Sequence, residues 1–237
     1  MIKAVFFDLY NTLVRFWPPV EEVQLAACSQ LGLRVSKEGL LRGYALADQF
    51  FNQENARQPL AQRSPEERHH FFSRYEQYIL RGAGLEVSEE VAGQVWREVQ
   101  KIPTRLALFD DALPALEGLR ARGLTLGGIS NLRRNMPAMA GGLGLEGHLD
   151  FIVTSEEAGA EKPHPPIFRA ALQRAQVEPS QAVHVGDQYE SDVLGAQGVG
   201  IRAVLLDRHG HHPLPHNTPR IRTLTELEGW LEQEGLL

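Results

Sequence analysis

The sequence predicts an α/β fold: a parallel sheet with helices on both faces, and an all-helical domain inserted after the first strand. Three observations predict it. From about residue 105 onward, short apolar runs alternate with helical patterns, as expected for parallel strands joined by crossover helices. Between about residues 19 and 101, apolar residues recur at helical spacing. The apolar run at residues 2–8 precedes this helical block, so it needs the later strands as its partners.

The first strand and the helical block have clear local signals. Residues 2–8 form a short, aromatic-rich apolar run that ends in polar residues. The segment Ser64-Pro65-Glu66-Glu67 combines a capping serine, a proline at the first helical position and acids in the first turn, which is typical of a helix start. Four helices are expected, at residues 21–32, 37–55, 64–84 and 88–100. We therefore predict a core formed by residues 1–14 and 104–237 and a helical domain formed by residues 15–103.

The second half of the chain contains the alternation that defines the sheet. Its strands are expected at residues 124–130, 151–155, 182–187 and 202–207. Its helices are expected at residues 111–123, 135–145, 165–177 and 190–200. Gly123 ends the first of these helices, since glycine readily adopts the left-handed conformation that follows a last helical turn. In such a sheet, ligands bind beyond the carboxyl ends of the strands.

Composition and charge exclude several classes of function. The formal net charge of −6 argues against non-specific nucleic-acid binding, which requires a basic surface. No run approaches the roughly 18 apolar residues of a membrane span. The chain starts directly in a strand, with no basic segment or cleavage site before it, so we expect a cytoplasmic protein. The one cysteine, Cys28, lies in an apolar stretch and is expected to be a buried structural thiol.

Polar residues stand where the predicted strands end. These residues are Asp8, Ser130-Asn131, and Asp187 with Asp192 five positions later. Lys162 lies in the connection between the third strand and the next helix. Because the carboxyl ends of parallel strands meet at one edge of a sheet, we expect all these side chains to face one crevice.

These residue types fit nucleophilic catalysis with a covalent intermediate. A carboxylate such as Asp8 can attack an electrophilic centre and form that intermediate. The charge that develops needs donors, which Ser130, Thr12 and the ammonium of Lys162 can supply. Carboxylates that share a small crevice repel each other unless a cation lies among them. Mg²⁺ suits one or two carboxylates plus a phosphate oxygen, and Asp8 and Asp187 would supply that pair.

Four short motifs in this order, DLYNT, SN, KP and GDQYESD, resemble those of the haloacid dehalogenase-like (HAD) hydrolases. The resemblance covers nearly the whole chain: a Rossmann-like core, and an insertion that resembles the all-α cap of subfamily I. It implies that Asp8 is the nucleophile, that Ser130 binds the transferring group and that Lys162 neutralises charge. It also implies that Asp187 helps to hold Mg²⁺ and that Asp192 lies close to the metal.

Tyr10 departs from the phosphatase pattern. The phosphatases that this chain resembles carry a second aspartate two residues after the nucleophile, and it protonates the leaving alkoxide. The dehalogenases of the family have a tyrosine there, because halide leaves without a proton. Tyrosine, with an ordinary pKa of about 10, is a poor acid at neutral pH. The Tyr10 backbone carbonyl can still bind a metal, so a metal-dependent phosphatase is possible. Because the acid is missing, we predict weak activity on alkyl phosphates and better activity on acyl or aryl phosphates, whose leaving groups need less protonation.

Other positions favour a phosphatase. The dehalogenases in the resemblance work without a metal and carry Ser-x-Asn at the fourth strand end, where this chain has Gly186-Asp187. They also carry a tyrosine at the position of Phe168. Our first hypothesis is a Mg²⁺-dependent phosphatase acting on a small phosphorylated metabolite. The alternatives are a metal-independent 2-haloacid dehalogenase and a non-catalytic binding protein. The residues expected to contact the substrate are Tyr10, Asn11 and Asn131.

Overall fold

The structure, a computed structural model, describes residues 1–131, 141–210 and 218–237 and divides into two compact units. The core unit comprises Met1–Arg15 and Leu106–Leu237, and the cap unit comprises Phe16–Arg105. The α/β fold with an inserted helical domain is confirmed. The helix predicted at residues 135–145 lies mostly outside the described residues.

Within its described residues, the core unit contains a parallel sheet of six strands in the order β5-β4-β1-β6-β7-β8. The strands are β1 (Ala4–Asp8), β4 (Thr125–Ser130), β5 (Phe151–Thr154), β6 (Ala182–Gly186), β7 (Arg202–Leu206) and β8 (Arg220–Ile221). The five predicted strands are confirmed, and β8 is an addition that the sequence did not reveal. The first strand, β1, lies between β4 and β6, so its partners are indeed the later strands.

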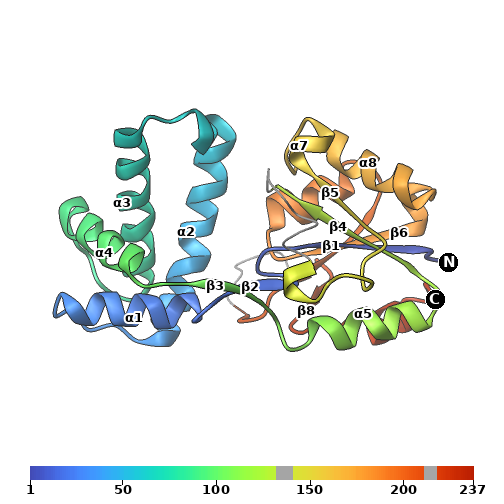
Figure 1. The fold of residues 1–237 in the computed structure, drawn as a ribbon, viewed down its shortest axis with the longest axis horizontal. Coiled ribbons are helices and arrows are strands. Elements are labelled where there is room, and N and C mark those ends of the chain that lie inside the picture. Colours follow the sequence, from blue (N-terminus) through green and yellow to red (C-terminus); the bar gives the residue numbers. More distant parts are fainter. Residues whose placement is uncertain (132–140, 211–217) are drawn as a thin grey trace. The chain divides into compact units, whose positions relative to one another are not determined.

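Helices cover both faces of this sheet (Figure 1). The helices are α5 (Ala112–Ala121) and α10 (Glu226–Gln233) on one face, and α8 (Pro165–Ala175) and α9 (Gly195–Gln197) on the other. Val5 and Phe7 of β1 pack with α5 and α10. Ala4 and Phe6 of the same strand pack with α8 and α9, because successive side chains of a strand point to opposite faces. Burial of both faces explains why this strand is apolar throughout.

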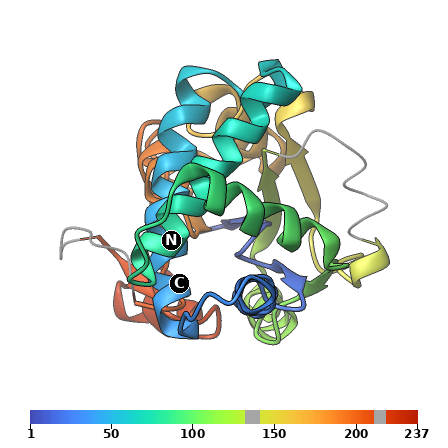
Figure 2. The ribbon, with the colours of Figure 1, turned by 90° about the vertical axis from the view of Figure 1, so that its left-hand side faces the viewer.

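In its described residues, the cap unit contains four α-helices and one 3₁₀ turn at Leu60–Gln62. The helices are α1 (Val20–Gln30), α2 (Lys37–Arg57), α3 (Pro65–Gly82) and α4 (Glu89–Lys101). Helices α2 and α3 pack side by side (Figure 2), and a Cβ at Gly43 would lie only 2.0 Å from the Ile79 carbonyl oxygen. The predicted start of α3 is confirmed, since Ser64 and Glu67 form a reciprocal capping box. Neither these helices nor any others that the structure describes combine the length and apolar composition of a membrane span.

Two short strands that the sequence did not reveal form a sheet of their own. They are β2 (Val14–Trp17) and β3 (Arg105–Leu108), and the division between the core and cap unit falls within them. Each has four residues. A run this short contains too little alternation of apolar and polar residues to be distinguished from a loop.

A carboxyl group is buried inside the cap unit. Glu76 of α3 is 1% exposed, and one of its oxygens accepts a hydrogen bond from the side-chain amide of Gln24 in α1. The other oxygen is buried and has no hydrogen-bond partner among the described residues. Burial raises the pKa of Glu76 to about 8, because the apolar surroundings disfavour the charged form. At neutral pH the protonated carboxyl is therefore favoured.

We expect the free energy of unfolding to decrease as the pH rises, because the buried Glu76 carboxyl group loses its proton. The folded state binds the Glu76 proton more tightly than the unfolded chain does. The contribution of this tighter proton binding to the stability of the folded state is therefore complete below the ordinary pKa of 4.5. It is lost as the pH rises through the folded-state pKa of about 8. Glu76→Gln should flatten this dependence of the melting temperature on pH.

The matched control is Glu90→Gln, which removes the same charge from an exposed position of α4. It should keep the wild-type pH dependence. A Glu76→Gln variant whose melting temperature falls with pH as steeply as that of the wild type would contradict the account.

Candidate active site

The carboxyl ends of three neighbouring strands meet at the centre of the core sheet. From β1 the chain continues to β4 and β5 on one side and then crosses to β6 and β7 on the other, so β1 lies where the strand order reverses. Asp8 is the last residue of β1, Ser130 is the last residue of β4, and Asp187 directly follows β6. Three of the predicted residues thus lie at one edge of the sheet.

Lys162 joins two carboxylates at this edge. It precedes α8 and is 6% exposed. Its Nζ donates to Asp8 Oδ1 at 2.5 Å and to Asp192 Oδ1 at 2.7 Å. Both aspartates are buried as well. An ammonium between two buried carboxylates offsets charges that would otherwise be costly to remove from water.

Burial and neighbouring charges shift the protonation of these three groups. Burial raises the pKa of Asp8 to about 6, although the charge of Lys162 opposes this shift. Burial also disfavours the charged form of Asp192, but Lys162 and a bond from His184 hold its pKa well below the usual range. Burial disfavours the ammonium of Lys162, and the two aspartates outweigh it and raise the pKa. At neutral pH the three groups therefore form two carboxylates around one ammonium.

Two residues of β6 that sequence reasoning did not assign to the site support Asp192. His184 is fully buried, and its Nε2 lies 2.9 Å from Asp192 Oδ1. Burial lowers the pKa of His184, so the neutral ring donates this bond from Nε2. Gly186 leaves the space that Asp192 occupies, since a Cβ there would lie 2.2 Å from the carboxyl carbon. The available signal was a histidine inside an otherwise apolar strand.

Asp192 reaches the site from a π-helical turn, Tyr189–Leu194. The regular helix predicted at residues 190–200 is therefore wrong in part, because only Gly195–Gln197 is α-helical there. The Asp192 N–H donates to the Gln188 carbonyl at 2.8 Å, and Asp192 Oδ2 accepts from the Gln188 N–H at 3.0 Å. The Val193 N–H also donates to the Gln188 carbonyl, at 3.4 Å and five residues back, which is the hydrogen bond of the wide turn. Such wide turns often occur at functional sites.

Asn131 binds the backbone of Lys162 from both sides. Its Oδ1 accepts from the Lys162 N–H at 2.6 Å, and its Nδ2 donates to the Lys162 carbonyl at 3.1 Å. The hydroxyl of Ser155 in turn donates to the Asn131 carbonyl at 3.0 Å. The side chain predicted to contact the substrate thus fixes the position of the lysine in this structure.

The turn after β1 carries the remaining predicted residues. Tyr10 is half-buried. Asn11 has a φ of 60°, a left-handed conformation that asparagine tolerates better than most residues. Thr12 is fully buried, and its Oγ1 has no hydrogen-bond partner among the described residues. A buried hydroxyl without a partner is a donor available to a bound group.

The carboxylates of the site can hold a cation. Asp8, Asp187 and Asp192 each offer an oxygen atom, and these atoms lie within 4.8 Å of one another. Carboxylate and carbonyl oxygens are the ligands that hard divalent cations prefer. The donor set therefore fits such an ion.

Residues 2–200 match the family of haloacid dehalogenase-like hydrolases. The chain belongs to this family. The match spans the strand-end motifs and the helical insertion, so the resemblance that these motifs carry is confirmed, and the protein is a hydrolase of the HAD superfamily.

Two relatives match most or all of this hydrolase. It is 31% identical over 208 residues to haloacid dehalogenase-like hydrolase domain-containing protein 3 of Bos taurus, which covers 86% of this chain and 82% of that protein. It is 30% identical over 238 residues to ribulose-1,5-bisphosphate 5-phosphatase of Halopiger xanaduensis, which covers 100% of this chain and 98% of that protein.

Similar solved structures include both kinds of enzyme that Tyr10 leaves open. A HAD phosphatase from Thermococcus onnurineus has a TM-score of 0.58 and 27% identity, and the match covers 97% of this chain and 98% of the other. A 2-haloacid dehalogenase from Pseudomonas syringae pv. Tomato DC3000 has a TM-score of 0.56 and 28% identity, with coverage of 99% and 100%. Similarity alone therefore does not choose between the two reactions.

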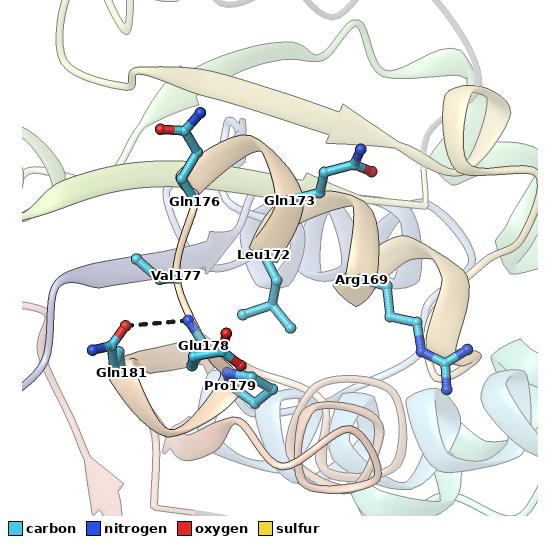
Figure 3. A pocket seen from close by; sticks show the side chains of 8 residues that line it. All are labelled: Arg169, Leu172, Gln173, Gln176, Val177, Glu178, Pro179 and Gln181. Atoms are coloured by element: carbon cyan, nitrogen blue, oxygen red, sulfur yellow. Dashed lines mark hydrogen bonds between the residues drawn. The ribbon is translucent and has the colours of Figure 1, made fainter.

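A pocket of about 470 Å³ lies away from the residues of the candidate active site (Figure 3). It is lined by Arg169 and later residues of α8 and by the segment that precedes β6. Helix α8 begins beside Lys162 at the carboxyl edge of the sheet and ends where β6 begins, at the amino edge. The pocket thus lies at the edge opposite the candidate site, and none of the candidate catalytic residues lines it.

We expect Gly186→Ala to displace Asp192 and to destabilise the core unit. The added Cβ would overlap the Asp192 carboxyl group, and overpacking of this kind costs about 1–3 kcal/mol of unfolding free energy. Denaturant unfolding curves measure the change. The control is Gly229→Ala in α10, where a Cβ would meet nothing within 4 Å. Unchanged stability in Gly186→Ala would contradict the close packing of Asp192 against β6.

Proposed function

We propose that this hydrolase is a Mg²⁺-dependent phosphatase that acts on a small phosphorylated metabolite through an aspartyl-phosphate on Asp8. The observation that carries the proposal is the cluster of Asp8, Asp187 and Asp192 around one lysine at the centre of the sheet. Three carboxylate oxygens within 4.8 Å of one another suit a divalent cation, and a cation in turn attracts a phosphate group. Similarity to ribulose-1,5-bisphosphate 5-phosphatase along the whole chain supports the same reaction class.

Mg²⁺ would be held by the carboxylates of Asp8 and Asp187 and the backbone carbonyl of Tyr10, with Asp192 close by. When bound, it would neutralise the phosphate oxygens and so permit the approach of an anionic nucleophile. A residue of any type at this position supplies a backbone carbonyl. The tyrosine therefore does not exclude the metal.

Asp8 is the nucleophile in this proposal. One of its carboxylate oxygens attacks phosphorus, and the phosphorus–oxygen bond to the leaving group breaks with its electron pair on the leaving oxygen. Water then attacks the aspartyl-phosphate, releases inorganic phosphate and restores the carboxylate. Lys162 keeps Asp8 ionised and oriented, since the ammonium lies 2.5 Å from it. Ser130 and the Thr12 hydroxyl, which has no hydrogen-bond partner in the described part of the chain, would donate to the transferring group.

Asn131 and Asn11 orient other groups of the site in this proposal. Asn131 holds the Lys162 backbone by two hydrogen bonds, so it sets where the ammonium lies. Asn11 turns the chain directly after the nucleophile by its positive φ. We infer that both shape the substrate-binding surface through the groups that they orient.

A specific observation favours a second candidate, the metal-independent 2-haloacid dehalogenase. In that reaction Asp8 would attack the halogen-bearing carbon, and halide would leave without protonation. Tyr10 favours it, as does the similarity to the dehalogenase from Pseudomonas syringae. The acidic cluster opposes it, because a third carboxylate at Asp187 brings negative charge close to an anionic substrate. The non-catalytic alternative gains no support from a site that keeps Asp8, Lys162 and Asp187 at one edge.

One comparison separates the two reactions. We expect the wild type to release phosphate from p-nitrophenyl phosphate with Mg²⁺ and to lose this activity in EDTA. Asp8→Asn should reduce the rate by at least about a thousandfold, because the nucleophile is lost. Asp110→Asn, at a side chain that is 96% exposed, is the matched control and should retain the rate. Metal-independent halide release from 2-chloropropionate without any phosphate release would overturn the proposal.

Replacing Tyr10 tests the missing acid. Tyr10→Asp would place a carboxyl group two residues after the nucleophile, where it can protonate a leaving alkoxide. We expect the kcat/KM ratio of glycerol phosphate to p-nitrophenyl phosphate to rise at least about tenfold, since a general acid contributes about 10²–10⁴-fold when the leaving group is poor.

Tyr10→Phe is the control for this ratio. Its ratio should match that of the wild type, because the phenolic hydroxyl is a poor acid at neutral pH. A selective loss of glycerol phosphate hydrolysis in Tyr10→Phe would show that the tyrosine itself protonates the leaving group.

A further inference from the structure

The turn that follows the nucleophile is bound from a distant part of the chain. Arg208 lies two residues beyond the end of β7 and 196 positions from Thr12. Its Nη2 donates to the Thr12 backbone carbonyl at 2.8 Å. The same guanidinium makes a two-pronged bond to Asp111, with Nη1 to Oδ2 at 2.7 Å and Nη2 to Oδ1 at 3.0 Å. Its central carbon also lies 3.8 Å from the centroid of the Phe109 ring.

The groups that hold Arg208 are themselves fixed. Asp111 Oδ2 accepts a further hydrogen bond from the Leu224 N–H at 2.8 Å. Phe109 donates its own N–H to the Leu13 carbonyl at 3.0 Å, so it contacts the same turn directly. The side chains of Arg208 and Asp111 are only 14% and 16% exposed. A guanidinium held by a carboxylate and a ring face has little freedom to move, and such a charge-assisted pair is stronger than a neutral hydrogen bond.

The turn itself has the properties of a segment that needs external support. Asn11 adopts a left-handed conformation, which is sparsely populated for residues other than glycine. Its N–H donates to the Val14 carbonyl at 2.6 Å, and the N–H groups of Leu13 and Val14 both donate to the Leu9 carbonyl. These bonds fold the turn but leave its carbonyl at Thr12 for a partner outside it, which is Arg208.

We propose that Arg208 is a positioning residue for the reaction: by binding the Thr12 carbonyl, it fixes the turn that carries the Tyr10 carbonyl and the Thr12 hydroxyl beside Asp8. The proposal rests on the proposed phosphatase function, in which the Tyr10 carbonyl would hold Mg²⁺ and the Thr12 hydroxyl would donate to the transferring group. Arg208 touches neither substrate nor metal and acts through the turn. Lysine cannot replace it fully, because a single ammonium cannot bind the carboxylate with two prongs and the carbonyl while covering the ring.

Kinetics and hydrogen exchange together test this role in the full-length protein. Arg208→Gln should lower kcat for p-nitrophenyl phosphate about 10–100-fold with a smaller change in KM, because displacements near 1 Å cost rates of that order. Arg208→Lys should recover part of kcat. Amide hydrogens of residues 9–14 should exchange faster in both variants, and this readout needs no activity.

Arg174→Lys and Arg174→Gln are matched controls. Arg174 also binds one backbone carbonyl, that of Ile152, and one carboxylate, that of Glu157, but it lies at the end of α8. Both controls should keep the wild-type kcat and the wild-type exchange of residues 9–14. If Arg208→Gln proves too unstable to purify, the same pair of measurements on Arg208→Lys decides.

The outcomes separate this proposal from the proposed function. Faster exchange of residues 9–14 together with a lower kcat supports it. Wild-type exchange of this segment in the Arg208 variants overturns it, whatever the activity. Faster exchange with an unchanged kcat also overturns it, because the turn would then be held without consequence for the reaction. Absence of phosphatase activity in the wild type, with faster exchange in the variants, would instead sink the proposed function and leave Arg208 as the support of the turn.

Discussion

The buried ammonium of Lys162, shared by Asp8 and Asp192, is the interaction on which the rest of the site depends. Without it, two carboxylates removed from water would repel each other with no compensating charge. Two members of the trio, Lys162 and Asp192, are held by other residues. The Asn131 amide binds the lysine backbone on both sides, and His184 donates to Asp192 from inside the sheet. The strand order brings these elements to one edge, with Asp8 on the central strand.

The cluster of carboxylates also limits what the presence of Tyr10 indicates about the reaction. Asp187 adds a third carboxylate oxygen to the cluster, within 4.8 Å of those of Asp8 and Asp192. A site of this kind suits a divalent cation and a phosphate better than a haloacid anion alone. Tyr10 removes an acid for the leaving group, yet its backbone carbonyl remains. The residue therefore bears on which phosphate esters are good substrates more than on which bond is broken.

The sequence predicted the features whose signals are local. Apolar runs identified five strands. A capping serine, a proline and acidic residues in succession, beginning at Ser64, identified the start of a cap helix. The two-residue strand β8 has no such run. Partners remote in sequence gave no signal either: the bond of Arg208 to Thr12 spans 196 positions, and that of Asn131 to Lys162 spans 31. The π-helical turn at Asp192 gave no signal either, because a single hydrogen bond from the Val193 N–H to the carbonyl five residues back leaves the spacing of apolar residues unchanged.

A crystal structure of the enzyme grown with Mg²⁺ and beryllofluoride tests the central claim most directly. Beryllofluoride imitates a phosphoryl group on a carboxylate, so the account predicts an adduct on an Asp8 oxygen and Mg²⁺ bound by Asp8, Asp187 and the Tyr10 carbonyl. Lys162 should remain in contact with Asp8. An Asp8 carboxylate without an adduct, in crystals with no metal between Asp8 and Asp187, would contradict the account.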